Sequence, residues 1–169
     1  TNITSLLQEF ENLGVKTTGS VENTNTLNWL KAKYQSFGYA ASQITEDIFT
    51  YGSATSKNLI ITKTGTVYPN IYVIICGHYD TITGPGVSDN GSGTSILLEA
   101  ARILKDVPTE YSVKFIHFSG EEQGLVGSNH YVNNVVFNNN NVRQLNLKVV
   151  FNIDQVGGKL SNPSNTIVC

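Results

Sequence analysis

The chain of 169 residues has no methionine, four prolines and only two cysteines. Two cysteines are too few for the multi-disulfide framework of a small secreted scaffold. Cys76 lies inside an apolar run and Cys169 is the last residue, and neither has a second cysteine at zinc-finger spacing. We therefore interpret Cys76 as a small buried side chain. A disulfide between Cys76 and Cys169 stays open at this point, because sequence alone does not decide it.

Charged residues are also scarce, at 14% of the chain, and the formal net charge is -2. This balance gives no electrostatic reason to expect nucleic acid or an anionic membrane as a partner. No apolar run approaches the roughly 20 residues that span a bilayer. Asparagine, serine, threonine and glycine are plentiful instead. We expect a secreted or extracytoplasmic protein of bacterial type, with any signal peptide already removed, and leave its oligomeric state open.

The hydrophobic pattern predicts alternating helices and strands. With 40% hydrophobic residues, the chain is long enough for one domain over 1–169 with a sizeable core. Apolar spacing and end signals predict helices over 1–13, 24–37, 93–105 and 124–136 and strands over 44–51, 57–62, 71–76, 113–118 and 147–153. We expect Asn23 or Thr24 to cap the second helix. The run over 71–76 has no polar alternation, which is typical of a strand buried on both faces. The pattern predicts an α/β fold, a three-layer αβα sandwich of the phosphorylase/hydrolase-like type around a mixed, mostly parallel sheet.

Polar side chains follow three of these strands. They are His78 and Asp80 after the strand over 71–76, Glu121 and Glu122 after 113–118, and Asp154 after 147–153. In an open α/β sheet the ligand crevice lies beyond the carboxyl ends of parallel strands, so these residues would meet at one edge. Carboxylates gathered there would repel one another unless a cation neutralised them. Carboxylates with one imidazole suit zinc, or less specifically manganese or cobalt.

Four short motifs make the pattern specific. They are Gly77-His-Tyr-Asp80, Ser88-Asp-Asn-Gly-Ser-Gly93, Phe118-Ser-Gly-Glu-Glu-Gln-Gly124 and Asn152-Ile-Asp154. In this order and on these elements, they resemble the motifs of the co-catalytic dizinc exopeptidases, the bacterial leucyl aminopeptidase family. The resemblance covers roughly residues 58–157. It implies a zinc-dependent metallopeptidase, an aminopeptidase that hydrolyses N-terminal peptide bonds of peptides or proteins with two Zn2+ ions per complete domain.

The resemblance implies a metal ligand at each of four positions. His78 and Asp154 would bind one zinc, Glu122 would bind the other, and Asp89 would bridge the two. Taken alone, an aspartate such as Asp89 is more often a helix N-cap than a metal ligand, and we expect it to do both here. In relatives the peptide bond after the bridging aspartate is often cis, which directs attention to Asp89-Asn90.

Two further carboxylates are implied to be catalytic. Glu121 would be the general base that takes a proton from a hydroxide-forming water between the metals and passes it to the leaving amine. Asp80 would orient His78 through the other ring nitrogen.

The sequence departs from the family pattern in one respect. The family uses a late histidine as second ligand of the Glu122 zinc, but the remaining histidines, His117 and His130, precede Asp154. We interpret both as structural. We therefore expect a C-terminally truncated member, whose Glu122 zinc site lacks its second ligand and which shows little or no activity by itself.

Three alternatives remain open from sequence. A glutaminyl cyclase would use one zinc to close a ring, and a carboxypeptidase of similar architecture would act at the other peptide end. A non-catalytic binding domain would keep the fold alone. The intact acids at 89, 122 and 154 argue against the last of these.

Overall fold

A computed structural model of the chain describes residues 2–157. Its helices are α1 (Asn2–Asn12), α2 (Val21–Ser36), α3 (Gly93–Leu104) and α4 (Val126–Tyr131), with short irregular turns η1 (Ala41–Gln43), η2 (Val87–Ser92) and η3 (Val132–Val136). Its strands are β1 (Ile44–Tyr51), β2 (Ala54–Lys63), β3 (Tyr68–His78), β4 (Tyr111–Phe118) and β5 (Asn146–Asn152). Every predicted element is present. Strand β3 is longer than predicted at both ends and carries His78 as its last residue.

Two predicted helices differ in detail. Ser20, not Asn23 or Thr24, caps α2, because its side chain accepts the N–H of Asn23. The helix predicted over 124–136 begins two residues later as α4 and continues as the wider turn η3. Leu125 before it has a φ of 63°, a left-handed conformation that no regular helix contains.

The five strands form one mixed sheet in the order β1-β2-β4-β3-β5. The pairings of β1 with β2 and of β2 with β4 are antiparallel. The pairings of β3 with β4 and of β3 with β5 are parallel. The predicted α/β sandwich with a mixed sheet is thus confirmed, but the sheet is not mostly parallel as predicted, because two of its four strand pairings are antiparallel. Its parallel part consists of the three strands that precede the polar motifs.

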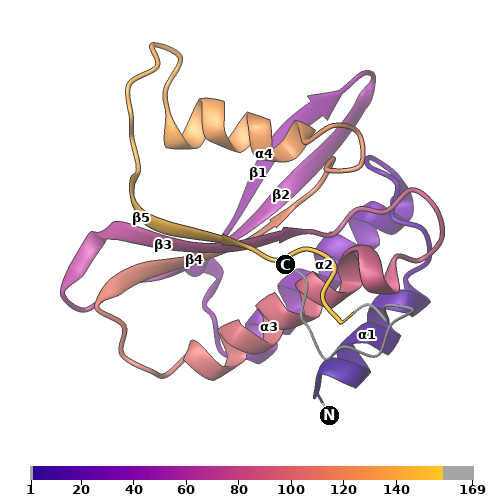
Figure 1. Cartoon of the computed structure of the whole chain (residues 1–169), viewed down its shortest axis with the longest axis horizontal. Helices are drawn as coiled ribbons and strands as arrows, with labels where there is room; N and C mark the ends of the chain where they lie inside the picture. Colours follow the sequence, from indigo (N-terminus) through magenta and orange to yellow (C-terminus); the bar gives the residue numbers. More distant parts are fainter. Residues whose placement is uncertain (1, 158–169) are drawn as a thin grey trace.

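Helices cover both faces of this sheet (Figure 1). Helices α1, α2 and α3 lie on one face, over a core that includes Phe10, Leu30 and Phe115. Helix α4 lies on the other face, over a smaller core that includes Ile116 and Tyr131. Strand β3 lies between β4 and β5 and is most buried towards its carboxyl end, as the absence of polar alternation in its sequence predicts.

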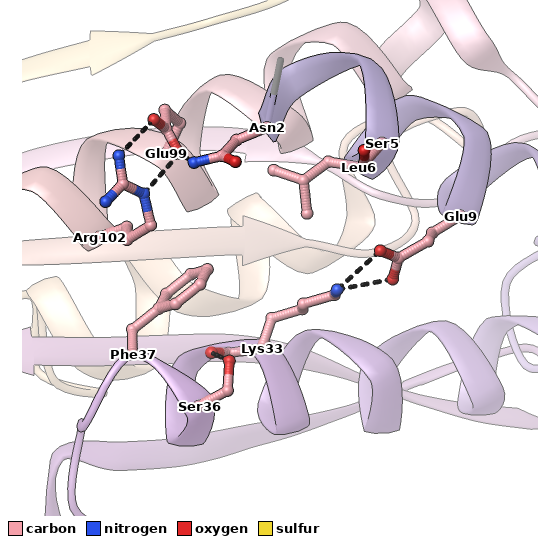
Figure 2. A pocket seen from close by; sticks show the side chains of 9 residues that line it. All are labelled: Asn2, Ser5, Leu6, Glu9, Lys33, Ser36, Phe37, Glu99 and Arg102. Carbon is pink, nitrogen blue, oxygen red and sulfur yellow. Dashed lines mark hydrogen bonds and ion pairs between the residues drawn. The ribbon is translucent and has the colours of Figure 1, made fainter.

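The helices of the first face enclose a groove, shown in Figure 2. Helices α1, α2 and α3 line it with two ion pairs, one between Lys33 and Glu9 and one between Arg102 and Glu99. None of the predicted site residues lines this groove. Among residues 2–157, no helix is both long and apolar enough to cross a bilayer.

Candidate metal centre

The register of the three parallel strands brings their polar motifs to one level. Cys76 of β3 pairs with Asn152 of β5, so His78 and Asp154 each follow a paired residue by two positions. His78 itself pairs with the last residue of β4, Phe118. The residues after these three strand ends therefore emerge at the same edge of the sheet, as the sequence predicts.

Asp89 reaches this edge from the turn η2. Asp89 and Asn90 have non-helical backbone angles inside this turn, and the peptide bond between them is cis. The fully buried Asn90 side chain donates to the Ile153 carbonyl at 2.9 Å and accepts the N–H of Gly93 at 2.9 Å. Asn90 thus ties the Asp89 turn to the segment that carries Asp154. Asp89 does not cap α3 as we expected: Ser92 occupies the N-cap position, and the first N–H of the helix, that of Gly93, bonds to Asn90.

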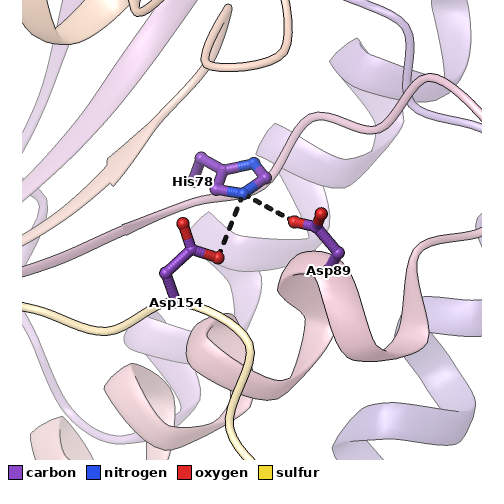
Figure 3. Close-up of side chains that lie close together, drawn as sticks. All are labelled: His78, Asp89 and Asp154. Carbon is purple, nitrogen blue, oxygen red and sulfur yellow. Dashed lines mark hydrogen bonds and ion pairs between the residues drawn. The ribbon is translucent and has the colours of Figure 1, made fainter. Parts of the chain in front are cut away.

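His78, Asp89 and Asp154 converge on one point, as Figure 3 shows. The Nε2 atom of His78 lies 3.0 Å from Asp89 Oδ1 and 3.6 Å from Asp154 Oδ1. One ligand atom from each residue lies within 4.8 Å of the others. The His78 ring is 3% exposed, whereas both aspartates are about two-fifths exposed, so the group is open to solvent on the carboxylate side.

Asp80 lies behind the His78 ring, on the Nδ1 side. The nearest acceptor to His78 Nδ1 is the backbone oxygen of Asp80, at 3.1 Å, and the Asp80 carboxylate is 3.5 Å away. Asp80 thus contacts His78 Nδ1 more closely through its backbone carbonyl than through the carboxylate that we expected to orient the ring. Its carboxylate accepts the backbone N–H groups of Glu121 and Glu122 instead, each at 3.2 Å.

The two adjacent glutamates lie differently relative to this group. Glu121 Oε2 is 4.0 Å from His78 Nε2, beside the three converging ligand atoms. Glu122 is outside the group of three. Burial and the charge of Asp89 raise the pKa of the Glu122 carboxyl.

The electrostatics of the edge favour a cation. Burial alone would lower the pKa of His78, but contact with Asp80 and the charges of Glu121 and Asp154 outweigh it and raise that pKa to about 9. Burial and the surrounding carboxylates also raise the pKa of Glu121 and of Glu122, against the opposing effect of His78. His78 therefore favours its protonated, charged form, whereas Glu121 and Glu122 favour their protonated, neutral forms. Both shifts indicate an excess of negative charge at this edge of the sheet.

Sequence comparison identifies the protein family of this chain. A model described as peptidase family M28 matches residues 58–166, which contain all the site residues. The chain belongs to peptidase family M28. The family resemblance predicted from the four motifs is thereby confirmed.

Individual M28 relatives match over different lengths. Aminopeptidase YwaD of Bacillus subtilis is 39% identical over 129 residues, which is 75% of this chain and 27% of that protein. The structure of BSAP, a zinc aminopeptidase from Bacillus subtilis, is 42% identical with a TM-score of 0.54, covering 63% of this chain and 26% of that one. The LapA aminopeptidase of Legionella pneumophila is 28% identical with a TM-score of 0.71, covering 91% and 42%. The chain thus spans about a quarter of YwaD and less than half of LapA.

Glutaminyl cyclases share the fold as well. A Bacteroides thetaiotaomicron glutaminyl cyclase has a TM-score of 0.74 at 19% identity, covering 94% of this chain and 62% of that one. At this identity the likeness shows the fold alone.

The donor set of this M28 chain fits a zinc ion. One imidazole nitrogen and two carboxylate oxygens are ligands that zinc accepts, and three protein ligands with an open position are typical of catalytic zinc sites. The other ring nitrogen of His78, Nδ1, contacts the backbone oxygen of Asp80, as is usual for histidines that bind a metal through Nε2. On the outer side, Gln155 Nε2 donates to Asp89 Oδ2 at 2.7 Å.

The two remaining histidines and Cys76 lie apart from this group. His117 Nε2 is 2.8 Å from the Tyr34 hydroxyl, inside the core under α2. His130 Nε2 is 3.2 Å from Asp47 Oδ1, between α4 and β1. Cys76 is a buried free thiol in β3, and burial raises its pKa to about 11. These residues have the structural roles predicted for them. The pairing of Cys76 with Cys169, which the sequence left open, involves a residue outside the described range 2–157.

Sequence reasoning missed the residues that brace the site. One is Lys16, whose buried ammonium donates to the carbonyls of Gly14 at 2.6 Å and Pro85 at 2.9 Å and lies 3.9 Å from the ring centroid of Phe10. Burial lowers its pKa to about 8. Lys16 thereby anchors the segment that leads from β3 to Asp89. A single lysine in a polar loop carries no sequence signal for such a role.

Proposed function

We propose that the protein is a zinc-dependent aminopeptidase that removes residues from the free N-terminus of peptides or proteins. The observation that carries this proposal is the convergence of His78, Asp89 and Asp154, with Glu121 beside them, in a chain of family M28. The names of its relatives, YwaD as an aminopeptidase and BSAP as a zinc aminopeptidase, support the same reading. Secretion, suggested by the polar uncharged composition, belongs to the proposal as well.

In this proposal His78, Asp89 and Asp154 hold the zinc. A bound zinc lowers the pKa of water to about 7 and polarises the scissile carbonyl. Asp80 fixes the ring of His78 so that its Nε2 atom faces the ligand group. Glu121 accepts the proton of the attacking water at Oε2 and later delivers it to the leaving amine. The raised pKa of Glu121 suits this role, because the carboxyl must keep the proton after taking it from water and before giving it to the amine.

A second zinc would use Glu122 together with Asp89, and without a histidine ligand from this chain it should bind too weakly to fill this site. Burial and the charge of Asp89 raise the pKa of the Glu122 carboxyl, a repulsion that a cation would relieve. The chain has three histidines. His117 and His130 are bonded elsewhere, so no histidine of this chain assists Glu122.

Zinc binding is the first test. Isothermal titration of the chain with Zn2+ should give binding that His78→Gln weakens by at least a hundredfold, because the substitution removes the one nitrogen ligand. His130→Gln is the matched control, since it removes a histidine that faces Asp47, and it should leave the affinity within about twofold. Equal affinities for the parent chain and His78→Gln would exclude this metal centre.

The second test separates the enzyme classes. The full-length protein is assayed with leucine p-nitroanilide, with and without a chelator, alongside N-terminal glutaminyl and C-terminal peptide substrates. Chelator-sensitive release of nitroaniline supports the aminopeptidase. Ring closure of the glutaminyl substrate would instead indicate a cyclase, release of a C-terminal residue a carboxypeptidase, and zinc binding without turnover a binding domain.

A further inference from the structure

The connection between α1 and α2 reaches the loop that carries the two glutamates. Thr18, which is 8% exposed, lies with its hydroxyl 3.3 Å from Asp80 Oδ2. The same hydroxyl contacts the side-chain amide of Gln123, the residue after Glu122. Thr18 lies outside the matched residues 58–166, and no motif singled it out.

The Asp80 carboxylate accepts hydrogen bonds from the backbone of the loop that carries Glu121 and Glu122. Its Oδ1 atom accepts the N–H of Glu121 and its Oδ2 atom the N–H of Glu122. Asp80 is fully buried, so water does not supply a substitute partner. The direction of its carboxylate therefore sets the backbone of both glutamates, and through it the position of the Glu121 side chain.

The hydrogen count at Thr18 determines how the contact works. A threonine hydroxyl has one hydrogen to donate and lone pairs to accept. The charged Asp80 oxygen is the stronger acceptor, so the hydroxyl donates there. In the structure the Oε1 atom of Gln123 faces this hydroxyl. Two acceptors cannot share its one hydrogen, so we exchange O and N of the amide, which turns the NH2 group towards Thr18; heavy-atom positions do not distinguish the two orientations. The result is a relay in which Gln123 donates to Thr18 and Thr18 donates to Asp80.

A second contact ties the same N-terminal segment to the start of this loop. Asn23 Nδ2 donates to Ser119 Oγ at 3.0 Å and is 3.4 Å from the Lys16 carbonyl. Ser56 Oγ bridges Asn23 and Ser119, at 2.7 and 2.9 Å. Residues 16–23 thus hold the loop at Ser119 and, through Thr18, at Glu121–Gln123. The segment 16–23 therefore contacts both the start and the end of the loop 119–123.

We propose that Thr18 is a positioning residue for Glu121, acting through the Asp80 carboxylate and assisted by the Gln123 amide. The proposal rests on the function proposed above, because it assigns Glu121 the proton transfer. It assigns the α1–α2 connection to the active site although that connection contributes no metal ligand.

Amide hydrogen exchange of the chain without added metal tests the proposal directly. Thr18→Val keeps the shape of the side chain but removes its donor. We expect exchange at the Glu121 and Glu122 amides to accelerate at least tenfold. Thr18→Ser restores the donor and should restore slow exchange. Thr26→Val is the matched control, because Thr26 is equally buried and its hydroxyl bonds only the Glu22 carbonyl of its own helix.

A second variant covers the case in which Thr18→Val does not fold. Gln123→Met removes the amide from a partly exposed position and should accelerate exchange at the same two amides. The proposal is overturned if neither variant accelerates these amides beyond Thr26→Val, or if acceleration is uniform along the chain. In the full-length metal-loaded enzyme, Thr18→Val should lower kcat about tenfold with little change in KM. Since exchange is measured without zinc, failure to bind zinc would overturn the proposed function and leave the exchange result standing.

Discussion

Asn90 joins two segments that are 63 residues apart in the chain, the Asp89 turn and the end of β5. Its amide accepts from the N–H of Gly93 and Gln155 and donates to Ile153. An alanine here would leave these buried backbone groups without their partner. The positions of Asp89 and Asp154 relative to His78 would then no longer be held.

We therefore expect Asn90→Ala to weaken zinc binding about 10- to 100-fold, the usual cost of losing a residue that supports metal ligands. Isothermal titration with Zn2+ measures this. Asn134→Ala is the control, because the Asn134 side chain is exposed and bonds only to His130, one helical turn away. An Asn90→Ala chain with parental affinity would show that the two ligands are held by other contacts.

His117 should make the stability of the fold depend on pH. Complete burial lowers its pKa to about 3, while in the unfolded chain it titrates near 6.5. Between these values the unfolded state binds more protons, so the free energy of unfolding decreases as the pH falls. From pH 7 to pH 4.5 this group alone should cost about 2.5 kcal/mol.

The measurement compares urea unfolding of the parent chain and His117→Gln at both pH values. The variant has no titrating group at this position, so its stability should fall by less over the same interval. The carboxylates at the metal centre contribute equally to both chains and cancel. Identical pH dependences would mean that folding does not lower the pKa of His117.

Strand β5 lies at an edge of the five-stranded sheet and exposes apolar side chains on both faces. Val149, Val150 and Phe151 are between 39% and 53% exposed. Unpaired strand edges with exposed apolar residues favour pairing between molecules. We therefore expect the chain to self-associate as its concentration rises.

Val150→Lys should reduce this association, because a charge on an edge strand opposes pairing. Sedimentation velocity over a tenfold concentration range measures the effect. Val21→Lys is the control. Val21 is 70% exposed, but it lies at the start of α2, away from the sheet edge. Equal association of both variants would locate the contact elsewhere.

The metal centre draws its residues from three strand ends and a turn, so an ion bound there would link distant parts of the molecule. The structure brings together one group of three ligands among residues 2–157. We expect the chain to bind one zinc per molecule and to hydrolyse leucine p-nitroanilide below detection. At a free zinc concentration about 100-fold above Kd, stability should rise by about 2.7 kcal/mol.

Titration calorimetry gives the stoichiometry, and thermal unfolding with zinc and with chelator gives the stabilisation. His78→Gln should lose the zinc-dependent increase in melting temperature while keeping the melting temperature of the chelated parent within a few degrees. Two ions bound per chain, together with rapid hydrolysis, would contradict this expectation.

Much of this organisation was predictable from local patterns. The apolar runs and their breaks predict every helix and strand, because periodicity reports which face is buried. The placement of His78, Glu121 and Asp154 after strands predicts one shared edge, because parallel strands align their carboxyl ends. Helix faces were less predictable. Ile103 is apolar but 56% exposed, because α3 buries the face that carries Leu97, Leu98 and Ala101.

The sequence by itself determined the family, the order of the elements and the candidate ligands, since these depend on residue type and short-range spacing. Only the tertiary structure decided how the site is held. The contacts of Lys16 with Pro85, Thr18 with Asp80 and Asn90 with Ile153 join residues more than 60 positions apart. Such contacts depend on how the chain packs back on itself, and no local pattern carries that information.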